Sequence, residues 1–242
     1  MKQENSFLNL IFNIILPSVI LIWGNKFFKF FTLVSETFSE QQISLAIFLL
    51  AISLPLAYGV YDLISRKKWN IFSIIGVVSV LLTGGIGLLH IDTTWMIVKE
   101  TAIPLVLGVA VLASAYTKKP LAKILIFNEN LLNLEKVNHA LDEKNTRKNF
   151  EKDLLSATYL LALSFLVSAI LNFLLAYNIF KSPSGTPEFN EEVGRMTALS
   201  WPVIVIPTSI ILIFAMYKVF NATTRYTGLK FEDLLSEQLK NK

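Results

Sequence analysis

The stretch Leu81–Pro120 reads LLTGGIGLLHIDTTWMIVKETAIPLVLGVAVLASAYTKKP and predicts two membrane-spanning helices joined by the short turn HIDTTW. The apolar run on each side of that turn approaches the ~20 residues that a helix needs to cross a hydrocarbon layer about 30 Å thick. Four ionisable residues lie in or near the turn: His90, Asp92, Lys99 and Glu100. The stretch therefore favours an integral membrane protein with polar side chains near one end of these two helices.

Long apolar runs of the same kind make up most of the 242-residue chain, whose apolar content is 53% and whose mean hydropathy is +0.55. This apolar content exceeds that of ordinary soluble domains. We predict an all-α integral membrane protein with one transmembrane domain, residues 1–242, built as a bundle of six helices. The predicted spans cover about residues 7–23, 43–64, 71–89, 95–116, 154–177 and 196–220, with a connector at 117–153 and a tail at 221–242.

Lysine and arginine are distributed unequally between the two sides of these spans. The side that holds both termini, the turn at 66–68 and the connector at 117–153 carries 17 of the 22 positive residues. The other side carries 4, and Lys99 lies within a span. Because positive residues favour the cytoplasmic side of a membrane, we expect both termini in the cytoplasm. We interpret the net charge of +4 as favouring contact with an anionic membrane surface and not with nucleic acid.

The basic connector at 117–153 has apolar residues that recur at mostly helical spacing after Pro120. This spacing predicts an amphipathic helix lying on the membrane surface. A calmodulin-like or nucleic-acid-binding helix is the alternative interpretation.

The loop before the last span contains a helix start signal. Thr186 suits an N-cap, Pro187 the first helical position, and Glu188 the positive end of the helix dipole. We expect a short helix that runs into the last span, which Pro202 and Pro207 interrupt or kink.

The first two spans carry polar residues that we assign to the inner side of the membrane, Asn9, Asn13 and Asp62. Asn9, Asn13 and Pro17 share one helical face because they are four residues apart. Contact between helices is the alternative role for the two asparagines, since buried amides commonly bond a neighbouring helix. An ordinary surface ion pair with Arg66, four residues on, is the alternative role for Asp62.

A second group of polar residues is assigned to the outer side, and Lys99 and Glu100 are its most unusual members. An ionisable side chain inside a span is costly, at about 2.5–3.5 kcal/mol at the centre. Because the two residues are adjacent, their side chains leave the helix about 100° apart, and we do not expect them to pair with each other. A structural pair with another residue is the alternative to a functional site. The candidate outer site comprises His90, Asp92, Lys99, Glu100, Asn172 and Arg195.

The third span is rich in small residues. Gly76, Ser79 and Thr83 follow 3–4 spacing, which predicts a smooth face that lets another helix approach closely. Gly84 and Gly85 weaken the helix and allow a kink or a close contact.

Several kinds of chemistry have no support in the sequence. The chain has no cysteine, which excludes disulfides and thiolate sites, and its two histidines lack metal-ligand spacing. We therefore expect no metal, no cofactor and no catalytic residues. The expected partners are the lipid bilayer, other membrane proteins or a second copy of the chain.

Two stretches resemble the bacterial intracellular septation protein A family. The first carries a GG-x-x-x-LLH-x-D pattern, then Lys and Thr at the head of the next span, then a Lys-Lys connector; the second is AILNFLLAYNIF. The matching residues are Gly84, Gly85, Leu88, Leu89, His90, Asp92, Lys99, Thr101, Lys118, Lys119, Asn172, Ala176, Tyr177 and Asn178. Glu100, the long connector and the insert SPSGTPEFNEEVGRM depart from the family pattern, which points to a sister family.

The resemblance implies a bacterial inner-membrane protein that maintains the cell envelope or supports septation through contacts with envelope or division proteins, without a cofactor or catalysis. The residues themselves leave two other functions open. The polar clusters suit a small channel or a proton-coupled transporter. His90 and Asp92 suit the acid and base of an enzyme acting on lipid, although no nucleophile accompanies them.

Overall fold

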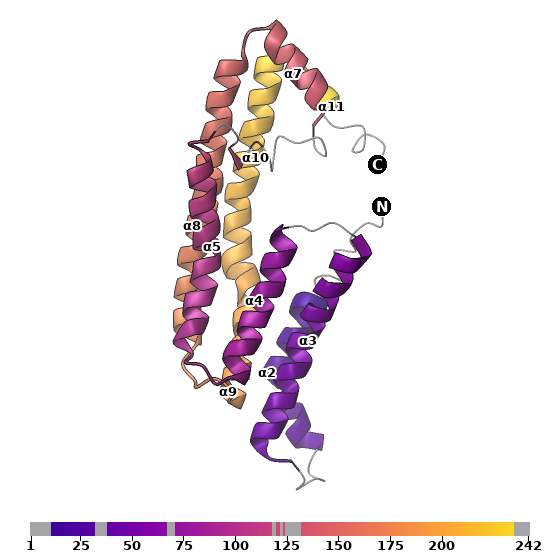
Figure 1. The fold of residues 1–242 in the computed structure, drawn as a ribbon, viewed down its shortest axis with the longest axis vertical. Coiled ribbons are helices and arrows are strands. Elements are labelled where there is room, and N and C mark those ends of the chain that lie inside the picture. Colours follow the sequence, from indigo (N-terminus) through magenta and orange to yellow (C-terminus); the bar gives the residue numbers. More distant parts are fainter. Residues whose placement is uncertain are drawn as a thin grey trace. The chain divides into compact units, whose positions relative to one another are not determined.

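A computed structural model describes residues 11–31, 38–66, 71–117, 120–121, 123 and 132–234, and within these residues the chain is helical and forms no strand. Figure 1 shows the helices as a series of long rods. In chain order the elements are the π-helix η1 (Ile11–Ile15), α2 (Leu16–Phe31), α3 (Glu40–Arg66), α4 (Ile71–Leu88), α5 (Thr94–Ser114), α7 (Leu134–Glu143), α8 (Arg147–Ile179), α9 (Pro187–Ser200), the π-helix η2 (Trp201–Val205), α10 (Ile206–Thr227) and α11 (Phe231–Leu234).

Five stretches of helix in the described part of the chain are long and apolar enough to cross a membrane. They are Ile11–Phe28, Glu40–Tyr61, Thr94–Ser114, Arg147–Ile179 and Pro187–Thr227. The predicted third span forms α4, which contributes the shorter apolar segment Ile75–Leu88. The helices thus suggest a membrane-embedded protein, and the sixth span stays a prediction.

The chain divides into two compact units. Unit 1 comprises Met1–Thr101 and Leu171–Ile204, and unit 2 comprises Ala102–Ile170 and Val205–Lys242. Each has a hydrophobic core of its own.

Unit 1 is built on α2, α3, α4 and α9, with the first turns of α5 and the last turns of α8. Its core includes Phe48, Met96 and Phe189, which are almost fully buried. Gly194 lets α9 approach α2 closely, because a Cβ there would lie 3.1 Å from the carbonyl oxygen of Ser18. A closely packed wall of α2, α3 and α9 results.

One polar contact fixes α9 against α3 in this wall. The side-chain amide of Asn190 donates to the carbonyl oxygen and to the hydroxyl of Ser44, each at 2.9 Å. Both residues are about 1% exposed. Because buried amides are costly unless bonded, this pair determines which face of α9 turns inward.

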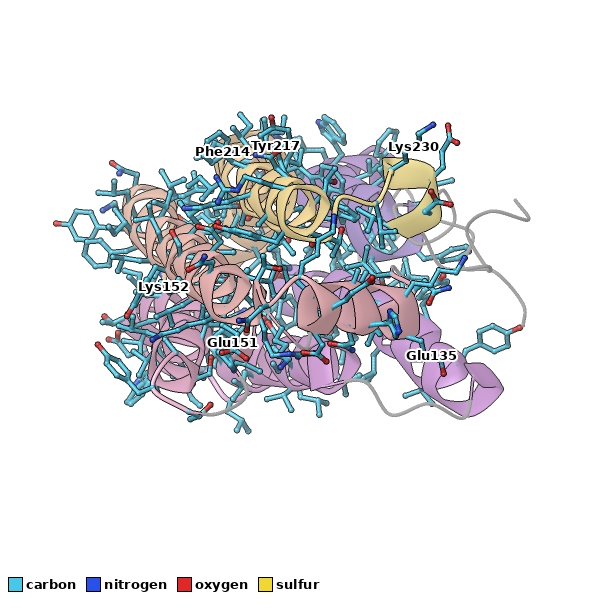
Figure 2. The ribbon with its side chains drawn as sticks, turned by 90° about the horizontal axis from the view of Figure 1, so that it is seen from above. Glu135, Glu151, Lys152, Phe214, Tyr217 and Lys230 are labelled. Atoms are coloured by element: carbon cyan, nitrogen blue, oxygen red, sulfur yellow. The ribbon has the colours of Figure 1, made fainter. Side chains whose placement is uncertain are left out.

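Unit 2 is built on α8 and α10, which run side by side, and on most of α5, with α7 and α11 at one end (Figure 1). Ser164 on α8 donates its hydroxyl to the carbonyl of Thr208, in the first turn of α10, at 3.1 Å. On the outside of α10, Phe214 and Tyr217 are exposed, as bilayer-facing aromatics would be (Figure 2).

The apolar side of α7 packs inside unit 2. Val137 and Leu141 are fully buried with Val219 of α10 and Leu234 of α11. The prediction placed this apolar face on the membrane surface, whereas the described part of the connector uses it to cover the ends of α10 and α11. Residues 118–119, 122 and 124–131 of the connector lie outside the described residues.

Several helix ends differ from the prediction. The first predicted span ends at residue 23, but α2 continues to Phe31, and α8 begins at Arg147, seven residues before the predicted 154. Amphipathic and polar flanks can extend a helix because their side chains reach water while the backbone bonds continue.

The predicted helix start and interruption near the last span are confirmed. The Thr186 hydroxyl accepts from the Phe189 N–H at 3.2 Å, and Pro187 follows it at the first helical position. The π-turn η2 surrounds Pro202, and α10 begins at Ile206, immediately before Pro207.

Candidate functional site

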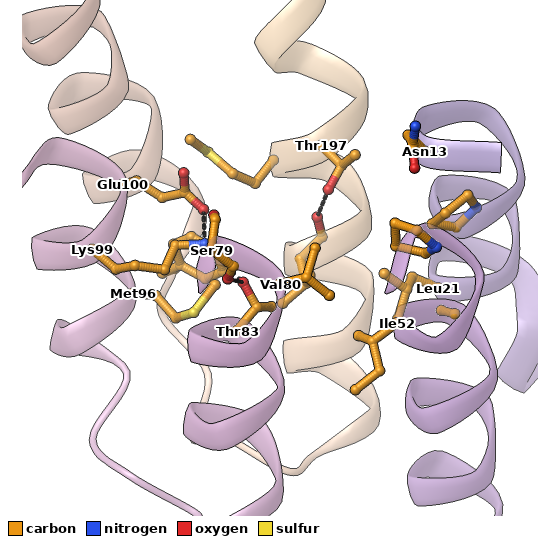
Figure 3. A pocket seen from close by; sticks show the side chains of 16 residues that line it. Asn13, Leu21, Ile52, Ser79, Val80, Thr83, Met96, Lys99, Glu100 and Thr197 are labelled. Carbon is orange, nitrogen blue, oxygen red and sulfur yellow. Dashed lines mark hydrogen bonds and ion pairs between the residues drawn. The ribbon is translucent and has the colours of Figure 1, made fainter. Parts of the chain in front are cut away.

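A cavity of about 180 Å³ lies within unit 1. Sixteen residues from η1, α2, α3, α4, α5, α9 and the residue after α8 line it (Figure 3). They are Asn13, Pro17, Leu21, Ala51, Ile52, Pro55, Ser79, Val80, Thr83, Met96, Lys99, Glu100, Phe180, Val193, Met196 and Thr197. The cavity is therefore lined by stretches of helix long and apolar enough to cross a membrane, together with the shorter apolar segment of α4.

Lys99 and Glu100 place an ion pair in this cavity. The Lys99 ammonium lies 2.6 Å from the Glu100 carboxylate and donates to the Thr83 hydroxyl at 2.7 Å (Figure 3). Thr83 in turn donates to the carbonyl of Ser79 at 3.0 Å. The side chains of Lys99 and Glu100 are 6% and 22% exposed, so the ammonium is held deeper and by more contacts than the carboxylate.

The expectation that Lys99 and Glu100 do not pair is wrong. It rested on the direction in which the two side chains leave the helix, and that direction does not fix where the charged groups end. Four methylenes in Lys99 and two in Glu100 allow both stems to bend toward the cavity. In surroundings of low dielectric the attraction between the two charges is strong enough to favour that conformation.

Two prolines make irregular backbone part of the cavity wall. Pro17 follows the π-turn η1, and Pro55 lies inside α3. A proline has no N–H for the carbonyl four residues before it, which in α3 belongs to Ala51. Pro55 and Ala51 both line the cavity, so this break in the ladder of α3 hydrogen bonds borders it.

Residues that the sequence assigned to opposite sides of the membrane meet in this cavity. Asn13 was assigned to the inner side, and Lys99 and Glu100 to the outer side, yet all three line it. Asn9 and the side chain of Asp62, the other inner candidates, lie outside the described residues.

His90 belongs to a different arrangement, at the turn between α4 and α5. Its Nδ1 lies 3.1 Å from the carbonyl oxygen of Ser184, which can only accept, so Nδ1 carries the proton. Ser184 donates its hydroxyl to the carbonyl of Ile91, and Thr93 donates to the carbonyl of Ser182 at 2.7 Å. These bonds tie the α4–α5 turn to the loop that precedes α9.

Glu192 holds the same loop from its other side. Its carboxylate accepts from the Lys181 N–H at 3.2 Å and from the Ser182 hydroxyl at 2.8 Å. Gly185 completes the fit, because its φ is +83° and a Cβ there would overlap the His90 ring. His90 is thus accounted for by packing and hydrogen bonding.

Asp92 caps the start of α5. It accepts from the Thr94 N–H at 2.8 Å. Hydrogen bonds from the Thr94 hydroxyl and backbone N–H hold the pKa of Asp92 below its ordinary value. The carboxylate is therefore stabilised in its charged form at a helix N-terminus.

Arg195 and Asn172, the remaining outer candidates, are not among the residues that line the cavity. Arg195 is exposed on α9 and pairs with Glu191 at 3.3 Å; Lys26 of α2 reaches the same carboxylate at 3.4 Å. Asn172 lies partly buried on α8. Of the six outer candidates, the structure brings only Lys99 and Glu100 into the cavity.

The cavity also contains residues that the sequence did not single out as a site. Ser79 and Thr83 were assigned to a smooth packing face, and Met96 and Thr197 carried no signal beyond their helices. The close approach between α3 and α4 instead involves Gly84, where a Cβ would lie 3.0 Å from Ile52 Cδ1. Serine and threonine in a small-residue pattern suit helix packing and ligand contact equally, so spacing alone could not distinguish the two.

The arrangement offers one cation, one anion and three side-chain hydroxyls inside a largely apolar wall. Of the lining residues that the structure describes, only Lys99 and Glu100 are ionisable. Within the described chain, no group of three or more His, Asp or Glu side chains is placed to hold a metal ion. Such a cavity can bind a small polar solute through its charges and hydroxyls.

Comparisons of the chain with protein-family models, with curated proteins and with solved structures find no match.

Proposed function

We propose that this chain is a multi-pass membrane protein that binds a small polar solute in the cavity of unit 1 and acts as a small channel or proton-coupled transporter. The observation that carries the proposal is the ion pair of Lys99 and Glu100 beside a cavity of about 180 Å³. Ionisable residues within membrane spans are costly and commonly mark solute or proton pathways.

The irregular backbone around the cavity supports the same proposal. Membrane transporters commonly bind their solutes where helices are interrupted, because the interruption leaves backbone groups that can bond a ligand. Pro17 with the π-turn η1, and Pro55 with Ala51, provide such interruptions in two helices that border the cavity. An ion pair that served only to hold helices together would need neither a cavity nor broken helices around it.

Thiol labelling tests this proposal, because the chain has no cysteine of its own. Thr197→Cys places a thiol of similar size in the cavity wall. Ala176→Cys is the matched control, since Ala176 is fully buried in the core of unit 1 and does not line the cavity. We expect a membrane-impermeant thiol reagent to modify Thr197→Cys in proteoliposomes and to spare Ala176→Cys until the protein is denatured.

Labelling of neither variant in the folded protein would contradict the proposal, because a cavity closed to water can bind no solute from it. Thiol reagent added separately to each face of the membrane also tests the transport step. A channel or transporter should expose Thr197→Cys to both faces, whereas a receptor for a solute would expose it to one.

A second candidate function is a non-enzymatic role in envelope maintenance or septation at the bacterial inner membrane. The resemblance around Gly84, Gly85, His90 and Asp92 supports it, as does the predicted cytoplasmic location of both termini. Deletion of the gene should then alter cell shape or division, and cross-linking of the intact membrane should capture envelope or division proteins. Normal shape together with no such partner would contradict it.

A further inference from the structure

The charge balance of the cavity limits what it can bind. The lining residues that the structure describes carry one positive and one negative side chain, so this part of the lining is neutral overall. An unpaired charge in surroundings of low dielectric is strongly unfavourable. An ion that enters must therefore bring its own counter-charge or neutralise one of the two side chains.

The two charged groups are not held equally firmly. The Lys99 ammonium is the more buried of the two and also donates to Thr83, which is itself bonded to the backbone of α4. The Glu100 carboxylate is the more exposed, and among the described residues its ion-pair partner is Lys99. Glu100 is thus the group that an incoming ligand can displace, while the ammonium stays in place as an anion-binding site.

The walls on either side of this pair suit a small apolar group. Five different helices each contribute an apolar side chain to the cavity lining. These side chains are Leu21, Ile52, Val80, Met96 and Val193. The described side chains of α2, α3, α4 and α9 add no ionisable group to the lining. A ligand with one charged end and a short hydrocarbon part matches both the ammonium and these walls.

We infer that the cavity binds the anion of a small monocarboxylic acid together with one proton, which Glu100 takes up. This inference rests on the proposed function and names the class of solute. The neutral acid enters, its proton passes to the Glu100 carboxylate, and its carboxylate replaces that of Glu100 beside the Lys99 ammonium. The cavity is neutral before and after, so the solute and its proton move together without net charge.

Calorimetry on the full chain in lipid nanodiscs, with propionate as the probe, tests the inference. Titrations at one pH in buffers of different ionisation enthalpy report how many protons are taken up with each anion. We expect one proton per propionate, and an affinity that falls about tenfold for each rise of one pH unit.

Two variants test which side chain takes up the proton and which side chain binds the anion. Glu100→Gln is neutral like the protonated carboxyl group, so it should bind propionate without proton uptake and without the pH dependence. Lys99→Met should weaken binding by tenfold or more. Arg195→Gln is the control, because Arg195 is an exposed partner of Glu191 outside the cavity lining, and it should behave as the wild type. The Glu100→Gln result stands even if Lys99→Met does not fold.

Two results in which a probe binds would overturn the inference and leave the proposed function in place. One is binding of glycine but not of propionate, since a zwitterion brings both charges and needs no proton. The other is propionate binding without proton uptake in the wild type. Absence of binding for both probes, together with a labelled Thr197→Cys, would overturn the solute class alone, whereas an unlabelled Thr197→Cys would remove the proposed function as well.

Discussion

Two lysines within long apolar helices, one in each unit, have different surroundings. Lys99 of unit 1 pairs with the Glu100 carboxylate beside a cavity. Lys218 of unit 2 donates to the hydroxyl of Ser156 on α8. A hydroxyl keeps its neutral state and can bond its own helix when the lysine is absent, whereas a carboxylate left alone in an apolar wall cannot. The partner therefore decides whether a lysine within a long apolar helix can be removed without consequence.

The largest expected effect distinguishes these two lysines directly. Removing one member of a buried ion pair typically costs about 3–5 kcal/mol, and since Glu100 is 22% exposed we expect Lys99→Met to fall at the lower end. Lys218→Met should cost about 1 kcal/mol or less, because only a bond to a neutral hydroxyl is lost. The free energy of unfolding, measured by denaturant titration in mixed micelles, checks both.

Equal losses of unfolding free energy for Lys99→Met and Lys218→Met would contradict the expected difference between the two lysines. The double variant Lys99→Met with Glu100→Gln provides the control. It leaves no unpaired charge, so it should recover most of the stability that Lys99→Met loses.

The next largest loss of stability is expected at two glycines with positive φ, one in each unit. Gly185 of unit 1 has φ +83° and faces the ring of His90, and Gly228 of unit 2 has φ +68° and faces the ammonium of Lys144. Either change to alanine should cost about 1–2 kcal/mol for the backbone conformation. Gly185→Ala should cost about 1 kcal/mol more, at the low end for overpacking, because a ring cannot yield as the end of a lysine can.

Thermal unfolding of the two alanine variants in the same detergent checks this difference. The double variant Gly185→Ala with His90→Ala is compared with His90→Ala alone, and the difference between these two should be only the backbone cost. If Gly228→Ala proves the more damaging, the account of the loop before α9 is wrong.

A smaller effect is expected at the ion pair that links α8 to α10. Arg225 lies 2.6 Å from the Asp153 carboxylate, but its side chain is 59% exposed. Exposed pairs contribute about 0–1 kcal/mol, so Arg225→Gln should change the unfolding free energy within that range. The change should shrink further in high salt, which the Lys99 pair should resist. A loss comparable to that of Lys99→Met would show that exposure is no guide to the two pairs.

The smallest expected effect is the pH dependence at the α5 cap. Because the pKa of Asp92 is lowered in the folded protein, its contribution is present above its unfolded pKa and is lost as the pH falls through the folded value. Thermal midpoints measured between pH 6 and pH 3 should therefore fall more steeply in the wild type than in Asp92→Asn. Asparagine keeps an acceptor for the Thr94 N–H at every pH. Parallel curves for the two proteins would contradict this role of Asp92.

Much of the helix pattern could be predicted from hydropathy. The predicted spans 43–64 and 95–116 correspond to α3, Glu40–Arg66, and α5, Thr94–Ser114, with ends that differ by one to three residues. The ends of α2 and α8 were missed by seven or eight residues, because hydropathy detects apolar residues whereas backbone hydrogen bonds continue through polar ones.

The candidate site was predictable only in part. Lys99 and Glu100 stand out because ionisable residues are rare in apolar spans. Their pairing did not follow from the spacing, since it depends on how long side chains bend within a packed cavity. Asn13 and Thr197 could not be joined to them either, because contacts between η1, α5 and α9 arise from tertiary packing and leave no periodic trace in the sequence.

The bond between Asn190 and Ser44 has a consequence for how the cavity can vary. It sets the rotation of α9, and Val193 and Thr197 lie three and seven residues further along the same face. Substitutions at Val193 or Met196 can therefore enlarge or narrow the cavity without changing the rotation of α9. If the cavity binds a solute as proposed, changes in the volume of these side chains would alter the length of solute that fits while Lys99 and Glu100 stay the same.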